Sequence, residues 1–434
     1  MFTRVRIAYL IFLSLVLVIV HSAVHASDPD TDQRNVLIHE LYEQYRIVFE
    51  DLHRHPELSG QEVRTAQKVL AELNKLNLDE VTSGVGGHGV VGVLRNGIGP
   101  TLLMRADMDA LPIQEESGLP YASQNPGVMH ACGHDFHVAS ILASAHVLSQ
   151  LRDQWSGTLV IVFQPAEEAL SGAGPMIADG LFTRFPKPDM AIALHTTGNE
   201  PSGKISYRPE YFMAASDSVD VEFTGRGAHG SAPHLSIDPI EMAVEYVTKM
   251  NAIIAREVSP LQPALITVGS IHAGTRYNII PDKAHLQMTI RTYDEDVRNY
   301  IKRRVVEVAG EIAEAGRAPI PPVVHFPYGV GATYNDPTLA AQLGPVFKNV
   351  VGESNVTIRA PVMGAEDFSE FLRQGKIPGH YFFVGVTDPA VPKPWPGNHT
   401  ARFSVDFARA WPVGVKAMTA AVTTLLPVLE SAPR

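Results

Sequence analysis

The sequence predicts an α/β protein in which a mixed sheet is flanked by helices and a smaller α/β-plait domain is inserted. β-rich runs alternate with helical patterns in the first and last parts of the chain, as at residues 158–163 and 138–151. The first of these runs is continuously apolar, which is typical of a strand buried on both faces. Two helical patterns among four strands favour a plait in the middle of the chain. We therefore expect one domain from residues 27–208 and 330–434, with residues 209–329 inserted.

The N-terminus has the features of a secretory signal. Arg4 and Arg6 precede an apolar run over residues 7–20, and Ala26 marks the expected cleavage site. The run is shorter than the ~20 residues that a membrane-spanning helix needs, although an uncleaved anchor remains an alternative. We expect residues 1–26 to be a signal peptide and the mature protein to be exported, to the periplasm or out of the cell.

The composition narrows the function classes. The chain has 45% hydrophobic residues and a formal net charge of -11, and it lacks the basic run or face that binds nucleic acid. It contains one cysteine, Cys132, so an internal disulfide is excluded. In an exported protein this thiol stays reduced, pairs between chains or binds a metal.

The first third of the chain alternates helices and strands. Helical spacing predicts a helix over residues 35–52 and a second over 61–76, with Ser59 as its N-cap. Strands are expected at 89–94 and 101–106, and the second leads into Asp107 and Asp109. Two aspartates at this spacing can also be loop caps.

Polar side chains follow the next strands in the same way. The strand at 158–163 leads into Glu167 and Glu168, and a strand at 190–194 ends at His195. If these strands are parallel, their carboxyl ends bring the polar groups to one edge of the sheet, where open α/β sheets bind ligands. A solvated loop is the alternative for the glutamate pair.

The remaining elements complete the two predicted domains. The inserted domain has expected strands at 219–223, 264–271, 284–293 and 323–326, and helices at 239–255 and 296–315. The larger domain resumes with elements at 339–347, 367–372 and 381–386, a proline-rich loop that ends at His399, and a helix at 406–426.

Residues 129–137 hold Cys132 and three of the 18 histidines. A thiolate with imidazoles suits Zn, Mn, Co or Ni. Glu167, Glu168, His195 and His399 are the best further ligand candidates. A lone cysteine is more often a small buried side chain, and Cys-x-His is a short and common pattern, so the cluster alone leaves both interpretations open.

These stretches together resemble the M20 metallopeptidase family, in particular its amidohydrolase branch of hippurate, N-acyl-amino-acid and auxin-conjugate hydrolases. The matching motifs, which follow the family's order along the chain, are LHRHPEL (52–58), MRADMDALP (104–112), MHACGHD (129–135), QPAEE (164–168), LH (194–195), GAH (227–229), NIIP (278–281), MGAEDF (363–368) and His399. The resemblance implies a zinc-exopeptidase-like catalytic domain and an inserted domain that serves as a lid or in dimerisation.

The resemblance also implies a site with two divalent metal ions. The residues that match its ligands are Cys132, His134, Glu168, His195 and His399. Glu167 matches the general base. We interpret Asp109 as an orienting group behind the ligands and Asp107 as a structural residue. Other branches of the family have His-x-Asp where this chain has Asp107-Met108-Asp109, and an aspartate in place of Cys132, so the ligand set leaves the metal open among Mn, Zn, Co and Ni.

In the inserted domain, the resemblance implies that His229 stabilises the oxyanion and that Asn278 helps to hold the substrate carboxylate. The histidine of the family often comes from the partner subunit, or swings in on closure, and a homodimer or higher homo-oligomer through the inserted domain is expected. Turn formation is the alternative role for both residues. Arg291 is a further candidate for the carboxylate, or a surface charge on its strand.

We interpret the sequence as that of a metal-dependent amidohydrolase that cleaves N-acyl amino acids or short peptides, with Glu167 shuttling the proton. A metallocarboxypeptidase or dipeptidase is the alternative among enzymes, because it would use the same mechanism on substrates that differ only on the acyl side of the scissile amide. A metal-binding or sensing protein without catalysis is the alternative outside enzymes, and the presence of Glu167 argues against it.

Overall fold

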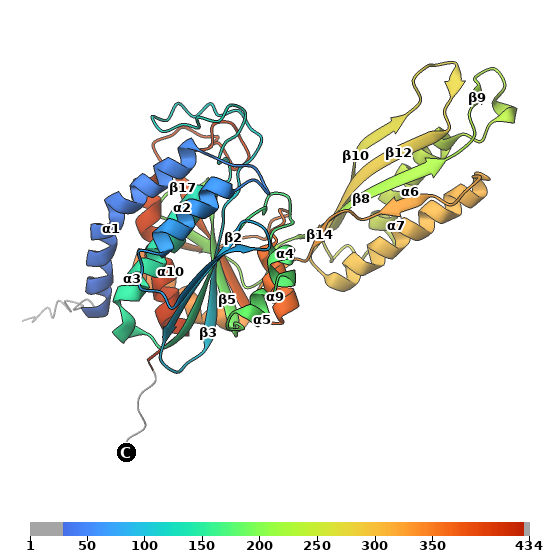
Figure 1. Ribbon diagram of the computed structural model, residues 1–434. Helices are drawn as coiled ribbons and strands as arrows, with labels where there is room; N and C mark the ends of the chain where they lie inside the picture. Colours follow the sequence, from blue (N-terminus) through green and yellow to red (C-terminus); the bar gives the residue numbers. More distant parts are fainter. Residues whose placement is uncertain (1–28, 429–434) are drawn as a thin grey trace, which may run out of the picture.

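An eight-stranded mixed sheet runs through the larger unit of the computed structural model, which describes residues 29–428 (Figure 1). In spatial order its strands are β1 (Glu80–Val85), β2 (Gly89–Asn96), β4 (Gly157–Gln164), β3 (Thr101–Asp107), β5 (Met190–Pro201), β17 (Gly379–Thr387), β6 (Ile205–Tyr207) and β16 (Val356–Ile358). The central strands β4, β3, β5 and β17 are parallel to one another. On one side of them, β2 pairs antiparallel with both β4 and β1. On the other side, β6 is antiparallel to β17 and parallel to β16. The predicted mixed sheet is confirmed.

Side chains of the central strands alternate between two apolar cores, one on each face of the sheet. In β4, for example, Ile161 and Phe163 enter the first core and Val160 and Val162 the second, and all four are at most 1% exposed. The first face is covered by α1 (Pro29–Arg54), α2 (Val63–Leu73), α3 (His134–Gln150), α8 (Pro337–Val351) and α10 (Phe407–Leu425). The second face is covered by α4 (Ala173–Ala178), α5 (Leu181–Arg184) and α9 (Phe368–Gly375).

The smaller unit has its own core and projects from one side of the larger unit (Figure 1). Its antiparallel sheet consists of β10 (Ala264–Ala273), β12 (Lys283–Thr292), β8 (Ala215–Thr224), β13 (Val323–His325) and β14 (Gly329–Val330). Two helices, α6 (Pro239–Arg256) and α7 (Glu295–Ala315), supply apolar side chains to the same core as this sheet. A short ribbon of β9 (Ala228–His229) and β11 (Ile279–Ile280) lies at its far end.

The chain crosses between the units at two neighbouring places. β7 (Glu210–Met213) pairs with β15 (Thr333–Asn335), and Phe212 and Met213 enter a core of the larger unit. On the other side of the crossing, Asp217 of β8 accepts hydrogen bonds from Arg298 of α7 at 2.7 and 2.9 Å. Three short 3-10 helices complete the described chain, at Arg152–Gln154, Pro233–Leu235 and Glu353–Asn355.

Three predicted details differ from the structure. Ser59 does not cap α2, which begins at Val63 with Glu62 as its N-cap residue. The Ser59 hydroxyl instead donates to Asp109 Oδ2 at 2.6 Å. α3 begins at His134, four residues before the predicted start, so this histidine is fixed in a helix. β5 continues through His195 to Pro201 because its following threonines are also buried in the sheet.

The predicted signal peptide, residues 1–26, lies outside the described residues. Among the helices from residue 29 to residue 428, none is long and apolar enough to cross a membrane.

Candidate metal and catalytic site

Strand ends and two loops build the site. Asp107 ends β3, and Glu167 and Glu168 follow the parallel strand β4, so both groups reach the same edge of the sheet. The turn before Glu167 has Ala166 in the left-handed region (φ 53°), and the Ala166 N–H donates to Glu62 Oε1 at 2.8 Å. A backbone strained in this way persists only where its surroundings fix it.

The segment with Cys132 is anchored between α3 and β5. Gly133 precedes α3 with φ 82°, and a Cβ at this position would lie 2.7 Å from Thr196 Oγ1. Only glycine fits both constraints. The C-terminal loop joins the same segment, since the His399 N–H donates to the Ala131 carbonyl at 2.8 Å. His399 itself has φ 63°, so a second strained residue lies at the site.

The hydrogen bonds that two histidines make through Nδ1 determine which ring nitrogen is left to bind a metal. His134 Nδ1 lies 3.2 Å from Asp109 Oδ1, and His195 Nδ1 lies 2.6 Å from the Thr196 carbonyl. A carbonyl or carboxylate oxygen accepts, so Nδ1 carries the proton in each ring and Nε2 is left as a ligand atom. Asp109 also accepts from the Glu168 N–H at 2.9 Å and therefore positions two of the predicted ligands.

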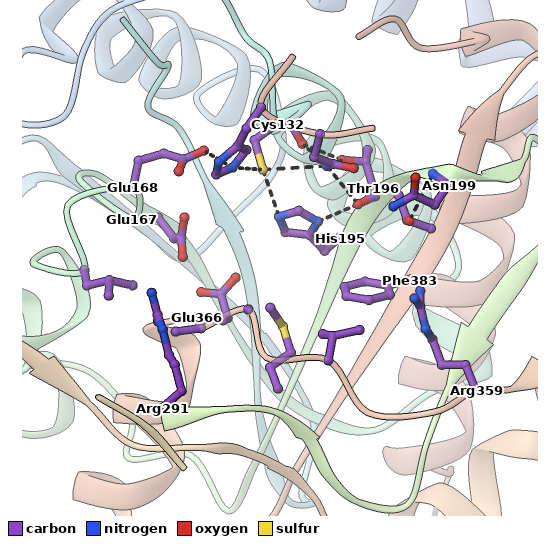
Figure 2. A pocket seen from close by; sticks show the side chains of 18 residues that line it. Cys132, Glu167, Glu168, His195, Thr196, Asn199, Arg291, Arg359, Glu366 and Phe383 are labelled. Carbon is purple, nitrogen blue, oxygen red and sulfur yellow. Dashed lines mark hydrogen bonds and ion pairs between the residues drawn. The ribbon is translucent and has the colours of Figure 1, made fainter. Parts of the chain in front are cut away.

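The five predicted ligand side chains meet around the Cys132 sulfur (Figure 2). Its Sγ lies 3.4 Å from His195 Nε2 and 3.3 Å from His399 Nε2. Glu168 Oε1 lies 3.3 Å from His399 Nε2 and 3.8 Å from His134 Nε2. Tetrahedral ligands at zinc distances of about 2.0–2.3 Å are themselves about 3.3–3.8 Å apart, so these separations match atoms that share a cation.

One of these atoms has a further property of a metal ligand. His134 Nε2 is buried and has no hydrogen-bond partner within the described residues, while Glu168 Oε1 is buried with His399 Nε2 as its ion-pair partner. An unsatisfied buried polar atom is costly, and a cation removes that cost. The donor set of one thiol, three imidazoles and one carboxylate therefore fits a divalent metal centre.

Metal binding at this site is coupled to the protonation of its ligands. Burial and the Glu168 carboxylate raise the pKa of the Cys132 thiol. Hydrogen bonds with Cys132 and Glu168 raise the pKa of His399 to about 10, whereas burial lowers the pKa of His195 to about 4. A divalent cation bound here would displace the protons of the thiol and of His399, because a thiolate and a neutral imidazole are the forms that bind a metal.

Glu167 lies beside this cluster and lines the same pocket. Its Oε2 is 3.9 Å from His134 Nε2. Burial and the carboxylates of Glu366 and Glu168 hold its pKa well above the ordinary value. A carboxylate with a raised pKa next to a cluster of candidate metal ligands has the properties of a general base.

A buried network behind Glu167 was missed by the sequence analysis. The Arg105 guanidinium, which is 0% exposed, donates to Asp107 at 2.7 Å and to Glu366 at 2.8 Å, and lies 3.3 Å from Asp367. Tyr381 donates to the other Glu366 oxygen at 2.5 Å. Arg105 and Glu366 are 261 residues apart, so only the fold shows that they pair.

His137 and Asn398 were also not singled out from the sequence. His137 Nδ1 donates to Asp107 at 2.5 Å, and its Nε2 accepts from the Thr196 N–H at 2.8 Å. Both nitrogens are thus occupied, and His137 is a support rather than a ligand. Asn398 donates to the carbonyls of Cys132 and Thr196, each at 3.3 Å, and so fixes the loop that carries His399.

The pocket in front of the cluster has a volume of about 440 Å³. Arg291 of β12 reaches it from the smaller unit (Figure 2). His229 and Asn278 are not among its lining residues; both are exposed in or beside the β9–β11 ribbon at the far end of the smaller unit. Within one chain, the structure therefore brings Arg291 to the site and leaves the other two away from it.

Comparison with known proteins decides the family. Residues 103–424 match the model of the peptidase family M20/M25/M40. The chain belongs to the M20 peptidase family. It is 40% identical, over 82% of its length and 88% of the relative, to thermostable carboxypeptidase 2 of Saccharolobus solfataricus. It is 36% identical to the hippurate hydrolase of Campylobacter jejuni, over 78% of this chain and 87% of that protein.

Solved M20 structures agree with the fold. A Bacillus subtilis protein described as a dinuclear metal-binding peptidase of the M20 family superposes with a TM-score of 0.74 at 28% identity, covering 89% of this chain and 99% of that chain. This M20 chain is therefore a metal-dependent hydrolase, and the predicted pair of divalent metal ions is confirmed at the level of the family.

Proposed function

We propose that this M20 enzyme hydrolyses the amide bond of N-acyl amino acids. The observation that carries the proposal is the arrangement of one pocket, in which four of the five ligand candidates, Glu167 and Arg291 face the same cavity. Amide hydrolysis needs an activated water, a polarised carbonyl and a proton for the leaving amine. Relatives named hippurate hydrolase and N-acetylcysteine deacetylase act on bonds of this kind and support the proposal.

Each residue then has a defined task. Cys132, His134, Glu168, His195 and His399 would hold two divalent metal ions, which would supply Lewis-acid activation of the water and the carbonyl. Glu167 takes the proton of the attacking water and returns it to the departing nitrogen. Arg291 is half-buried at the pocket wall and pairs with the free carboxylate of the amino acid.

Carboxypeptidase activity is the second candidate. It is favoured by the 40% identity to a carboxypeptidase, whose substrates also carry a free carboxylate after the scissile amide. The two activities differ in the acyl side alone. A panel of benzoyl- and acetyl-amino acids, dipeptides and longer peptides, assayed with and without a chelator, separates them. We expect chelator-sensitive release of the amino acid from the acyl derivatives, and faster release from the peptides would favour the carboxypeptidase.

We also propose that the enzyme acts as a homodimer or higher homo-oligomer through its smaller unit. His229 and Asn278 are exposed at the far end of that unit, so they can serve a pocket only if a partner's site, or a large closure, brings them there. This gives a physical reason for the family's use of a partner histidine.

Export of the mature protein remains a proposal from the sequence. Arg4 and Arg6, the apolar run after them and Ala26 support it. N-terminal sequencing of protein from the native host should find Ser27 at or near the start. A membrane fraction that retains residues 1–26 would instead indicate an uncleaved anchor.

A further inference from the structure

The turn that leads from β4 into Glu167 is held by a side chain outside the ligand cluster. Ala166, in the left-handed region with φ 53°, donates its N–H to Glu62 Oε1 at 2.8 Å. The Ala166 carbonyl accepts from the Ser171 N–H at 3.1 Å, within the same loop. Glu62 therefore ties the residue before Glu167 to the start of α2, and a left-handed backbone of this kind persists only where its surroundings hold it.

The Glu62 side chain does not serve its own helix. Glu62 is the N-cap residue of α2, yet its carboxylate makes no capping hydrogen bond there. Glu57 has that role instead, because it accepts from two N–H groups in the first turn of α2, at 3.0 and 2.7 Å. Glu62 Oε1 also accepts from the Gly60 N–H at 2.9 Å, which fixes the direction of the carboxylate toward Ala166.

The position of Glu62 is unfavourable for stability. The residue is 0% exposed, and its Oε2 is buried without a hydrogen-bond partner among the described residues. Burial raises the pKa of this carboxyl, and the nearby Asp109 carboxylate raises it as well. Burying an unpaired polar oxygen costs free energy, and proteins accept such a cost mainly at functional sites.

The two adjacent glutamates of the site thus have parallel supports. Asp109 accepts from the Glu168 N–H at 2.9 Å and so orients the metal-ligand candidate. Glu62 accepts from the backbone on the other side of Glu167. One carboxylate therefore fixes the backbone after the general base, and the other fixes the backbone before it.

We propose that Glu62 is a positioning residue for Glu167, because it holds the left-handed turn at Ala166 that directs the Glu167 carboxylate to the pocket. The inference rests on the proposed function, in which Glu167 transfers the proton. Glu62 is not among the lining residues of the pocket, so it acts through the backbone of Ala166 and not on the substrate. Loss of this hydrogen bond should displace the general base, and a displacement of about 1 Å can lower the rate about a hundredfold.

The test removes the acceptor and keeps the volume of the side chain. With the full-length, manganese-loaded enzyme and the acyl amino acid that the wild type cleaves fastest, Glu62→Met should lower kcat by about ten- to a hundredfold. KM and metal content should stay near those of the wild type. Glu62→Gln keeps an oxygen that can accept from Ala166 and should stay within about threefold of the wild-type kcat. Glu57→Met is the matched control: it removes two backbone hydrogen bonds at the same helix, and should lower the unfolding midpoint but keep kcat.

A double variant separates positioning from a general loosening of the site. In the Glu167→Gln background no catalytic carboxylate is left to be displaced, so adding Glu62→Met should change the residual kcat by less than about twofold. If the two losses multiply instead, Glu62 does not act through Glu167 and the proposal is overturned. If Glu62→Met does not fold, Glu62→Asp, which draws the carboxylate back by one methylene, is measured in both backgrounds with the same expectations.

Each other result has a defined meaning. A wild-type kcat in Glu62→Met overturns the proposal, and so does an equal loss of kcat in Glu57→Met, which would assign the effect to a shift of α2. A parallel loss of metal and activity in Glu62→Met also overturns it, because the residue then supports the ligands. These results leave the proposed function intact. If the metal-loaded wild type cleaves no acyl amino acid, the proposed function falls, and the positioning role falls with it.

Discussion

Glu167 and Glu168 are neighbours in the sequence, but their surroundings give them different tasks. Glu168 is held by its N–H to Asp109, and its Oε1 lies in the ligand cluster, 3.3 Å from His399 Nε2. Glu167 has a pKa raised by burial and by the carboxylates of Glu366 and Glu168, and lies at the pocket. One side chain is therefore suited to a metal and the other to a proton.

Glu167→Gln should lower kcat by roughly two to four orders of magnitude, because the amide keeps the size of the side chain but cannot take a proton. Metal content should stay near that of the wild type. Glu168→Gln is the matched control and should lose metal. Steady-state kinetics and elemental analysis of the same preparations check both. If Glu167→Gln is the variant that loses metal, the two roles are exchanged.

The smaller unit depends on a buried ion pair at its base, where Asp217 of β8 meets Arg298 and Lys302 of α7. Asp217 is 1% exposed and the Arg298 side chain 7%, so neither charge is well solvated. This pair fixes α7 on the sheet close to the crossing that leads to the pocket.

Asp217→Ala should destabilise the protein by about 3–5 kcal/mol, because it leaves a buried guanidinium without its main partner. Asp220→Ala on the same strand removes a carboxylate that is 31% exposed and should cost below about 1 kcal/mol. Urea unfolding followed by circular dichroism compares them. Replacing both Asp217 and Arg298 with apolar residues should recover much of the loss, and a double variant as unstable as Asp217→Ala would contradict the explanation.

The elements of the larger unit could be predicted where apolar periodicity was strong. β4 was expected at residues 158–163 and is observed as Gly157–Gln164, which places Glu167 correctly. The start of α3 was missed because a glycine, a histidine and an aspartate resemble a loop until the close approach of Gly133 to Thr196 is known. The end of β5 was missed because buried threonines after His195 look polar in a sequence.

At the scale of the whole molecule, the site joins segments from most of the chain. Cys132 and His399 are 267 residues apart, yet their side chains lie within 3.3 Å. Family motifs could identify such residues from the sequence. The Arg105–Glu366 pair and the position of Arg359 at the pocket could be found only in the folded structure, because no local sequence pattern indicates a long-range contact. The same holds for His229 and Asn278, whose distance from the pocket no sequence pattern shows.

Mixing two inactive variants tests whether His229 serves a partner's pocket. In a mixed dimer of Glu167→Gln and His229→Ala, one of the two pockets contains both an intact Glu167 and an intact His229 from the other chain. Equal mixing with free exchange should restore about a quarter of the wild-type activity for a twofold dimer. A mixed dimer verified by mass spectrometry that gains no activity would show that His229 acts within its own chain or has no role.

We expect Cys132 and the four side chains around it, His134, Glu168, His195 and His399, to hold the metal ions on which hydrolysis depends. The most direct measurement is the metal content per chain of the wild type and of Cys132→Ser, taken together with hydrolysis of an acyl amino acid by the same samples. We expect about two divalent ions per wild-type chain, since dinuclear sites of this kind work as a pair, and a parallel loss of metal and activity in Cys132→Ser and after chelation. Full activity in a wild-type sample shown to be free of metal would contradict the account.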